Sequence, residues 1–180
     1  MITFEIFEET GPAVSGRGSV TAITNVNWKN SEDVTQAYYF YPLRQPALGR
    51  DQTLSYKKYI FFKVSGDYTY LKNLKISITP TSDTIQATNT QLFYKFSNVY
   101  AEPTNAYDGD MINTNNAAIT WYPNISTVSP LQATARSTCV NDQTFVTGYF
   151  VTQMRVNQDV YTNVGNSIGF EIKFSATEFE

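Results

Sequence analysis

The stretch SYKKYIFFKVSGDYTYLKNLKISI, from Ser55 to Ile78, carries the clearest strand pattern in the chain. Near its end, every second residue from Leu74 to Ile78 is apolar, and the residues between them are polar. Successive side chains of a strand point to opposite faces, so this period of two predicts one buried and one solvated face. The segment SGDY in the middle supplies turn residues. We therefore expect two strands here, joined either as a hairpin or as a crossover between two sheets.

Alternating segments of this kind recur along the chain, separated by residues typical of turns. The further expected strands are Ile2–Phe7, Ser19–Val26, Thr35–Pro42, Gln91–Tyr100, Ala117–Pro123, Gln143–Val156 and Ile168–Ser175. Gly148 lies inside one of them and is a candidate β-bulge. No stretch longer than one turn has a helical period. The pattern predicts an all-β, single-domain antiparallel β-sandwich, jelly-roll-like, with about eight or nine strands.

The two expected parts of the chain are an N-terminal segment, residues 1–18, and a sandwich domain, residues 19–180. The segment consists of a strand and an arm rich in Gly and Pro, which favour loops. A strand that precedes such an arm can be lent to a neighbour, so we expect Met1–Phe7 to pair outside its own subunit. The long polar connection from Asn124 to Asp142 is expected at a subunit contact.

The composition favours the same fold class. Aromatic residues make up 15% of the 180 residues, with 13 Tyr and 12 Phe, and Tyr, Phe, Thr and Val suit a pleated, half-buried surface. Charged residues make up only 16%, against about 25% in ordinary soluble domains. A lightly charged surface rich in Tyr, Thr and Asn is suited to wet, polar contacts with protein or sugar.

The charge balance and the cysteine count exclude several classes of protein. The net charge of −3, from 13 basic and 16 acidic residues, offers no basic excess for phosphates, so we expect no nucleic-acid partner. Apolar runs are a few residues long, far short of a membrane span, so we expect no membrane partner. Cys139 is the single cysteine and cannot form an internal disulfide, which favours folding in a reducing cytoplasm.

No residue pattern predicts catalysis, and we expect no cofactor and no catalytic residue. The chain has no histidine, which removes the commonest general base and the commonest zinc ligand. Cys139 is therefore expected to be a small buried residue. Two carboxylates are enough for a glycosidase, and Glu5 with Glu171 is one such pair on expected strands. Sixteen acidic residues offer many such pairs, so the pattern gives this alternative little support.

The clearest acidic cluster is SNVYAEPTNAYDGDM, from Ser97 to Met111. Asp108 and Asp110 flank Gly109 like the start of a calcium loop, since calcium takes clustered carboxylate and carbonyl oxygens. The later acidic ligands of an EF-hand do not follow. Asp-Gly is also ordinary turn chemistry, with Gly supplying a positive φ. We expect a turn, and Asp108 with Asp110 remains a weak calcium candidate.

Two aromatic groups stand out as candidate contact residues. They contain Tyr38 and Tyr39 in AYYFYP, and Trp121 and Tyr122 in TWYP. Residues along a strand alternate between faces, so about half of each group points away from the core. Exposed Tyr and Trp anchor protein interfaces, and they also stack on sugars, so an interface is expected and a glycan site is the alternative. Trp28 is expected in the core.

Four phrases of the chain together resemble a virion structural protein of tailed bacteriophages, over most of the chain from about Ser55 onward. They are SYKKYIFFKVSGDYTYLKNLKISI, LFYKFSNVYAEPTNAYDGDM, ITWYPNISTVSPLQATAR and VGNSIGFEIKFS. The resemblance implies a jelly-roll or other β-sandwich module that decorates a capsid or builds a tail or baseplate. It implies folding in a bacterial host cytoplasm, a place in the virion, and other virion proteins as partners. It implies no catalytic residue.

The expected function is therefore that of a non-enzymatic structural subunit, homo-oligomeric, and first of all a head-decoration or capsid-auxiliary protein. A tail, neck or baseplate component is the next alternative. An alternative of another class is a glycan-binding adhesion module that uses the four aromatic residues named above.

Overall fold

The computed structural model describes residues 3–14, 17–32, 52–66, 70–80, 90–113, 118–124, 145–157 and 170–179. Every regular element in these residues is a β-strand, and all of the strand pairs are antiparallel. No described segment is a helix of the length and hydropathy needed to cross a membrane. The predicted all-β, antiparallel class is confirmed for this part of the chain.

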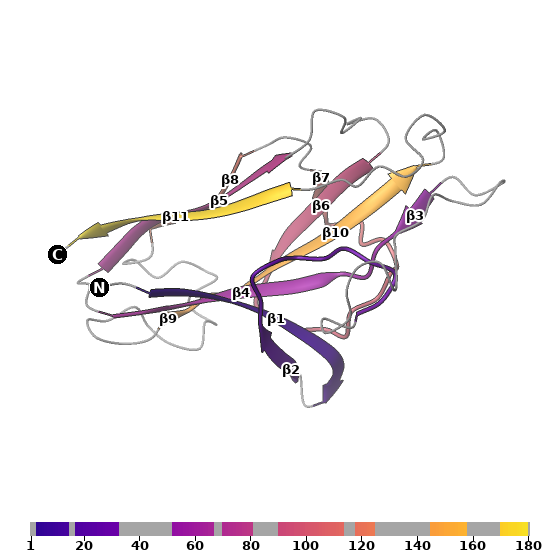
Figure 1. Ribbon diagram of the computed structural model, residues 1–180, viewed down its shortest axis with the longest axis horizontal. Coiled ribbons are helices and arrows are strands. Elements are labelled where there is room, and N and C mark those ends of the chain that lie inside the picture. Colours follow the sequence, from indigo (N-terminus) through magenta and orange to yellow (C-terminus); the bar gives the residue numbers. More distant parts are fainter. Residues whose placement is uncertain are drawn as a thin grey trace.

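The larger sheet has eight strands: six follow the order β2-β1-β4-β10-β6-β7, and β3 pairs with β10 and β9 with β4 (Figure 1). Its strands are β1 (Thr3–Val14), β2 (Arg17–Ala22), β3 (Gln52–Leu54), β4 (Lys58–Ser65), β6 (Thr90–Ser97), β7 (Ile112–Asn113), β9 (Phe145–Val146) and β10 (Tyr149–Asn157). The smaller sheet has the order β11-β5-β8. Its strands are β5 (Tyr70–Pro80), β8 (Ala118–Asn124) and β11 (Phe170–Phe179).

The stretch Ser55–Ile78 forms β4 and β5, which lie in different sheets. Of the two connections expected there, the crossover between sheets is the one observed. Eleven strands fall in the described residues, three of them only two or three residues long, so the expected count of eight or nine is not confirmed. The expected strand Thr35–Pro42 and the connection Asn124–Asp142 lie outside the described residues, apart from Asn124, which ends β8.

The Gly/Pro-rich arm is the main local correction, because β1 continues as a strand through Gly11 and Pro12 to Val14. Three residues separate Thr10 from Val14, whereas one separates their β2 partners Ser19 and Arg17, so β1 bulges at this point. Gly11 supplies the positive φ of 85° that the irregularity requires. Glycine and proline here mark a bulge in a β1–β2 hairpin, where we expected a loop.

The N-terminal strand is also paired differently from the expectation. β1 pairs with β4 of its own chain, from Thr3 opposite Ser65 to Glu9 opposite Tyr59. The expectation that Met1–Phe7 is lent to a neighbour is wrong for the described residues of that strand. The pairing is favourable because it covers one edge of β4, whose residues are among the most buried of the chain.

The predicted bulge at Gly148 is confirmed by the pairing of β4. Lys63 pairs with Val146 in β9 and Ile60 pairs with Phe150 in β10, so three residues of one strand face two of the other. The Phe62 N–H donates to the Thr147 hydroxyl at 3.0 Å, and the Phe62 carbonyl accepts from the Thr147 N–H at 2.9 Å. The extra residue lets Val146 pack on the same cluster as Tyr149.

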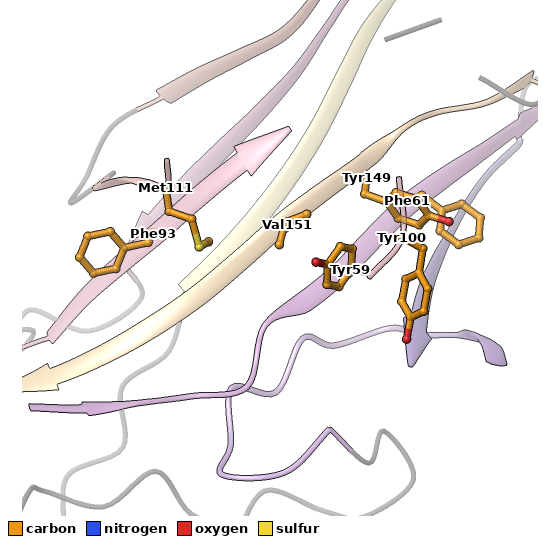
Figure 2. Close-up of a cluster of buried hydrophobic side chains, with 7 residues drawn as sticks. All are labelled: Tyr59, Phe61, Phe93, Tyr100, Met111, Tyr149 and Val151. Carbon is orange, nitrogen blue, oxygen red and sulfur yellow. The ribbon is translucent and has the colours of Figure 1, made fainter. Parts of the chain in front are cut away.

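Both faces of the central strands β4 and β10 are buried. One face, which we call the tyrosine face, carries a cluster shown in Figure 2: Tyr59, Phe61, Phe93, Tyr149 and Val151 from the sheet, with Tyr100 and Met111 lying over them. The other face, which we call the Phe62 face, carries Ile60, Phe62, Val64, Leu92 and Phe150, all at most 1% exposed. This double burial resembles that of a sheet covered on both sides.

Candidate functional site

The acidic segment Ser97–Met111 lies across the tyrosine face as a packed loop. Tyr100, near the start of the segment, and Met111, at its end, are buried in the cluster. Between them, the Thr104 carbonyl accepts from the Lys57 N–H at 3.0 Å, and the Gln153 side-chain amide approaches the Ala106 carbonyl at 3.4 Å. Contacts to both central strands or their flanking residues fix the position of the loop.

Asp108 is the charged anchor of this loop. Its carboxylate accepts from the Lys95 ammonium of β6, and the Lys57 ammonium lies 3.9 Å away. The Asp110 N–H donates to the other carboxylate oxygen at 3.1 Å. The hydrogen bond from Lys95 holds the pKa of Asp108 below its usual value, while burial lowers the pKa of Lys57 against the attraction of Asp108.

The turn expected at Asp-Gly-Asp is confirmed, because the Met111 N–H donates to the Asp108 carbonyl at 3.0 Å. The positive φ expected at Gly109 is wrong: Gly11 and Gly66 are the described glycines with positive φ. No group of three or more potential metal-binding side chains lies within the described residues. Calcium binding by Asp108 and Asp110 stays a prediction, and a calcium ion there would compete with the ammonium of Lys95.

A buried ion pair on the Phe62 face was not anticipated. The Lys58 ammonium lies 2.9 Å from a carboxylate oxygen of Glu8, and the side chains are 1% and 3% exposed. Burial raises the pKa of Glu8, and the charges of Lys58 and Lys29 oppose that rise. Lys29 is itself fully buried, and its carbonyl accepts from the Tyr56 N–H. Three charged side chains thus occupy the interior where β1 meets β4.

A second buried carboxylate, Glu9, ties the β1–β2 hairpin to the tyrosine face. Its two oxygens accept from the Gly18 N–H at 2.8 Å and from the Tyr149 hydroxyl at 2.5 Å. Nearby, the Tyr100 hydroxyl donates to the Gly11 carbonyl at 2.6 Å. Burial raises the pKa of Tyr100, and the negative charge of Glu9 raises it further. Both tyrosines therefore act as hydrogen-bond donors from the sheet or the loop to the hairpin.

One signal for these buried acids was present in the sequence. Lys58 stands two residues before Ile60, on the same face of an expected strand whose face is otherwise apolar. A lysine at such a position requires a buried partner. The partner was missed because Glu8 and Glu9 fall in the segment that we expected to be a loop.

The other candidate residues are not brought together in the described part of the chain. Glu5 lies in the larger sheet beside Lys63 at 2.9 Å, whereas Glu171 belongs to β11 of the smaller sheet. Trp28 is half-buried. Trp121 and Tyr122 lie in the backbone of β8, and their side chains fall outside the description, as do Tyr38, Tyr39 and Cys139 altogether.

Comparison with known protein families, with curated proteins and with solved structures finds no match to this chain.

Proposed function

We propose that the chain is a non-enzymatic structural subunit of a tailed-bacteriophage virion, made in the bacterial cytoplasm and acting through protein–protein contacts. A head-decoration or capsid-auxiliary protein is the first choice, and a tail, neck or baseplate component the second. The resemblance of the four sequence phrases from Ser55 onward motivates this assignment, and the surface of the β1–β2 hairpin supports the mode of action.

The proposal rests on a contrast between charged and apolar side chains: several carboxylates hold the fold together, whereas large apolar side chains are exposed. Glu8, Glu9 and Asp108 are each committed to hydrogen bonds or ion pairs that hold the fold. Strands β1 and β2, by contrast, expose one large apolar side chain on each face of the sheet, Phe4 at 44% and Val20 at 48%. These side chains are available for contacts with other proteins.

We also propose that the chain folds as a single antiparallel β-sandwich of the jelly-roll type, with the sheet β11-β5-β8 as the second layer. The burial of both faces of β4 and β10 supports a covering layer on the Phe62 face. Figure 1 draws the smaller sheet above β4 and β1 and to the left of β6 and β10 in the view. A rigid two-layer scaffold with an exposed hairpin is a suitable form for a subunit that attaches to a lattice.

The test is quantitative mass spectrometry of gradient-purified virions from cells that produce the chain, after separation of heads from tails. We expect the chain in particles at a fixed ratio to the major capsid protein, and in the head fraction. Recovery in the tail fraction would select the second choice. Recovery only in particle-free fractions would overturn the proposal, and a glycan array with folded protein would then test the adhesion alternative.

A further inference from the structure

The outer edge of β2 is an open strand edge among the described residues. β2 ends the path of the larger sheet, beyond β1, and Figure 1 draws it at the outer side of that strand. Ser19, Val20, Thr21 and Ala22 are all exposed, and no described strand pairs with the outer side of β2. Proteins usually protect an edge with charges, prolines or bulges, because free N–H and C=O groups recruit other strands.

The one protective device on β2 is the charge of Arg17 at the start of the strand, and none is present from Gly18 to Ala22. The five residues carry no charge and no proline. The bulge of the hairpin lies on β1, between Thr10 and Val14, so β2 keeps an unbroken backbone there. The segment is also held rigidly, because Glu9 accepts from the Gly18 N–H and Tyr100 fastens the facing strand at Gly11. A preorganised edge loses little conformational entropy when it pairs.

The direction of the free backbone groups follows from one hydrogen bond. The Ile23 N–H donates to the Ile6 carbonyl at 2.9 Å, so the amide of Ile23 faces β1. Backbone groups alternate along a strand, so Thr21 also faces β1, and the N–H and C=O groups of Val20 and Ala22 point outward. Two donors and two acceptors therefore stand in register on the open edge.

We propose that this edge pairs with the same edge of a second copy of the chain, forming a two-fold symmetric dimer with one continuous sheet. An antiparallel arrangement brings Val20 opposite Ala22 of the partner subunit, so their outward donors and acceptors meet. Thr21 then lies on the two-fold axis, opposite its own copy in a non-hydrogen-bonded pair, where threonine pairs are favourable. A second copy is favoured over a charged partner because the uncharged edge meets itself without repulsion.

The interface is small, since one short strand from each copy forms it, so the dimer is expected to be reversible and concentration-dependent. The test is sedimentation velocity over a wide concentration series, with Val20→Lys and Val99→Lys as a matched pair. Both valines are exposed, at 48% and 69%, and both variants add the same charge. We expect Val20→Lys to weaken dimerisation about tenfold or more and Val99→Lys to leave it unchanged, because like charges oppose edge pairing.

A cysteine at the symmetry axis tests the register, in a Cys139→Ser background. Thr21→Cys should give a disulfide-linked dimer on mild oxidation, because Cα atoms of a non-hydrogen-bonded pair lie about 4.5 Å apart, within disulfide range. Val99→Cys is the control and should give no disulfide-linked dimer under the same oxidation. A chain that stays monomeric at every concentration, or a dimer indifferent to Val20→Lys, would overturn the inference. The inferred dimer goes beyond the proposed function, and the two can fail separately. If the chain were absent from virions, the dimer would be unaffected. If the chain were a monomer and present in virions, only the dimer would be refuted.

Discussion

Two ion pairs join the same two strands at the same distance and lie in opposite environments. Glu8 with Lys58 and Glu5 with Lys63 both connect β1 to β4, and both have a nitrogen–oxygen distance of 2.9 Å. The first pair is at most 3% exposed, and the second is 39% and 42% exposed. The pair chemistry is the same, so any difference in energy comes from the surroundings.

The difference follows from strand geometry. Glu5 and Glu8 are three residues apart, so their side chains lie on opposite faces of β1. Glu5 stands directly opposite Lys63 near the solvated end of the sheet, whereas Glu8 stands opposite the fully buried Ile60. Removing one partner of a solvent-exposed pair costs little stability. Removing one partner of a buried pair leaves the other partner as an uncompensated buried charge.

The largest expected effect is that of Lys58→Met. It leaves the Glu8 carboxylate buried beside apolar side chains, so we expect the free energy of unfolding to fall by about 3–5 kcal/mol. Chemical denaturation of the variant measures this change. Lys63→Met is the matched control on the same strand, with an expected loss of about 0–1 kcal/mol. Equal losses in the two variants would show that burial does not distinguish the pairs.

The double variant Glu8→Leu/Lys58→Met sharpens the same comparison. Replacing both charges with apolar groups removes the unpaired carboxylate, so we expect much of the stability lost in Lys58→Met to return. A double-mutant cycle measured by denaturation gives the coupling between the two positions. A double variant less stable than Lys58→Met alone would mean that Glu8 has other favourable partners, Lys29 among them.

A smaller effect is expected for Tyr149→Phe, which removes one donor from the buried Glu9 carboxylate. Hydrogen bonds to charged groups contribute about 1.5–3 kcal/mol, so the loss should fall in that range. Tyr107→Phe is the control, because Tyr107 is 48% exposed, and surface changes usually stay within about 0.5 kcal/mol. Thermal unfolding of the two variants side by side decides whether the Tyr149 hydroxyl has this role.

The pH dependence of stability separates Glu8 from Glu5. The pKa of Glu8 is raised above the ordinary value of 4.5, so the folded state takes up its proton before the unfolded state as pH falls. The stability contribution of Glu8 therefore decreases as pH rises from 4.5 through the raised pKa. Denaturation from mildly acidic to neutral pH should show this decrease in the native chain and in Glu5→Gln, and a flatter profile in Glu8→Gln.

The smallest expected effect is that of Asp108→Asn, at the partly exposed anchor of the acidic loop. Its lowered pKa means that its stabilisation is present above the ordinary value of 3.8 and is lost as pH falls below it. We expect a loss of up to about 1 kcal/mol near neutral pH, and almost none for the exposed Asp110→Asn. A rise in melting temperature on adding calcium to chelated protein, absent in both variants, would instead establish a metal site there.

The local patterns of the sequence predict much of the fold. The alternation from Leu74 to Ile78 lies within β5, and Gly148 marks a real bulge, because both signals arise from neighbouring residues. The continuation of β1 through Gly11 and Pro12 was not predictable, since the local preference of these residues is for turns. Pairing with β2 on both sides of a bulge overrides that preference.

The candidate site was predictable only in part, for the same reason. The Asp108 turn depends on three adjacent residues and was anticipated. Its ion pairs depend on Lys95 in β6 and Lys57 before β4, which are brought together by long-range pairing. The Glu9 and Tyr149 contact spans strands that are far apart in the chain, and no local pattern encodes it.

The order of strands in the larger sheet has a consequence for the protein as it leaves the ribosome. β4 ends at Ser65, but its neighbour β10 begins at Tyr149, which is 84 positions later. At about 5–20 residues per second, β10 emerges roughly 4–17 s after β4. β1 can pair with one edge of β4 at once, while the other edge stays open during that interval. The nascent chain therefore exposes one of its most apolar strands for seconds, and we expect a holding chaperone to bind it until β10 arrives.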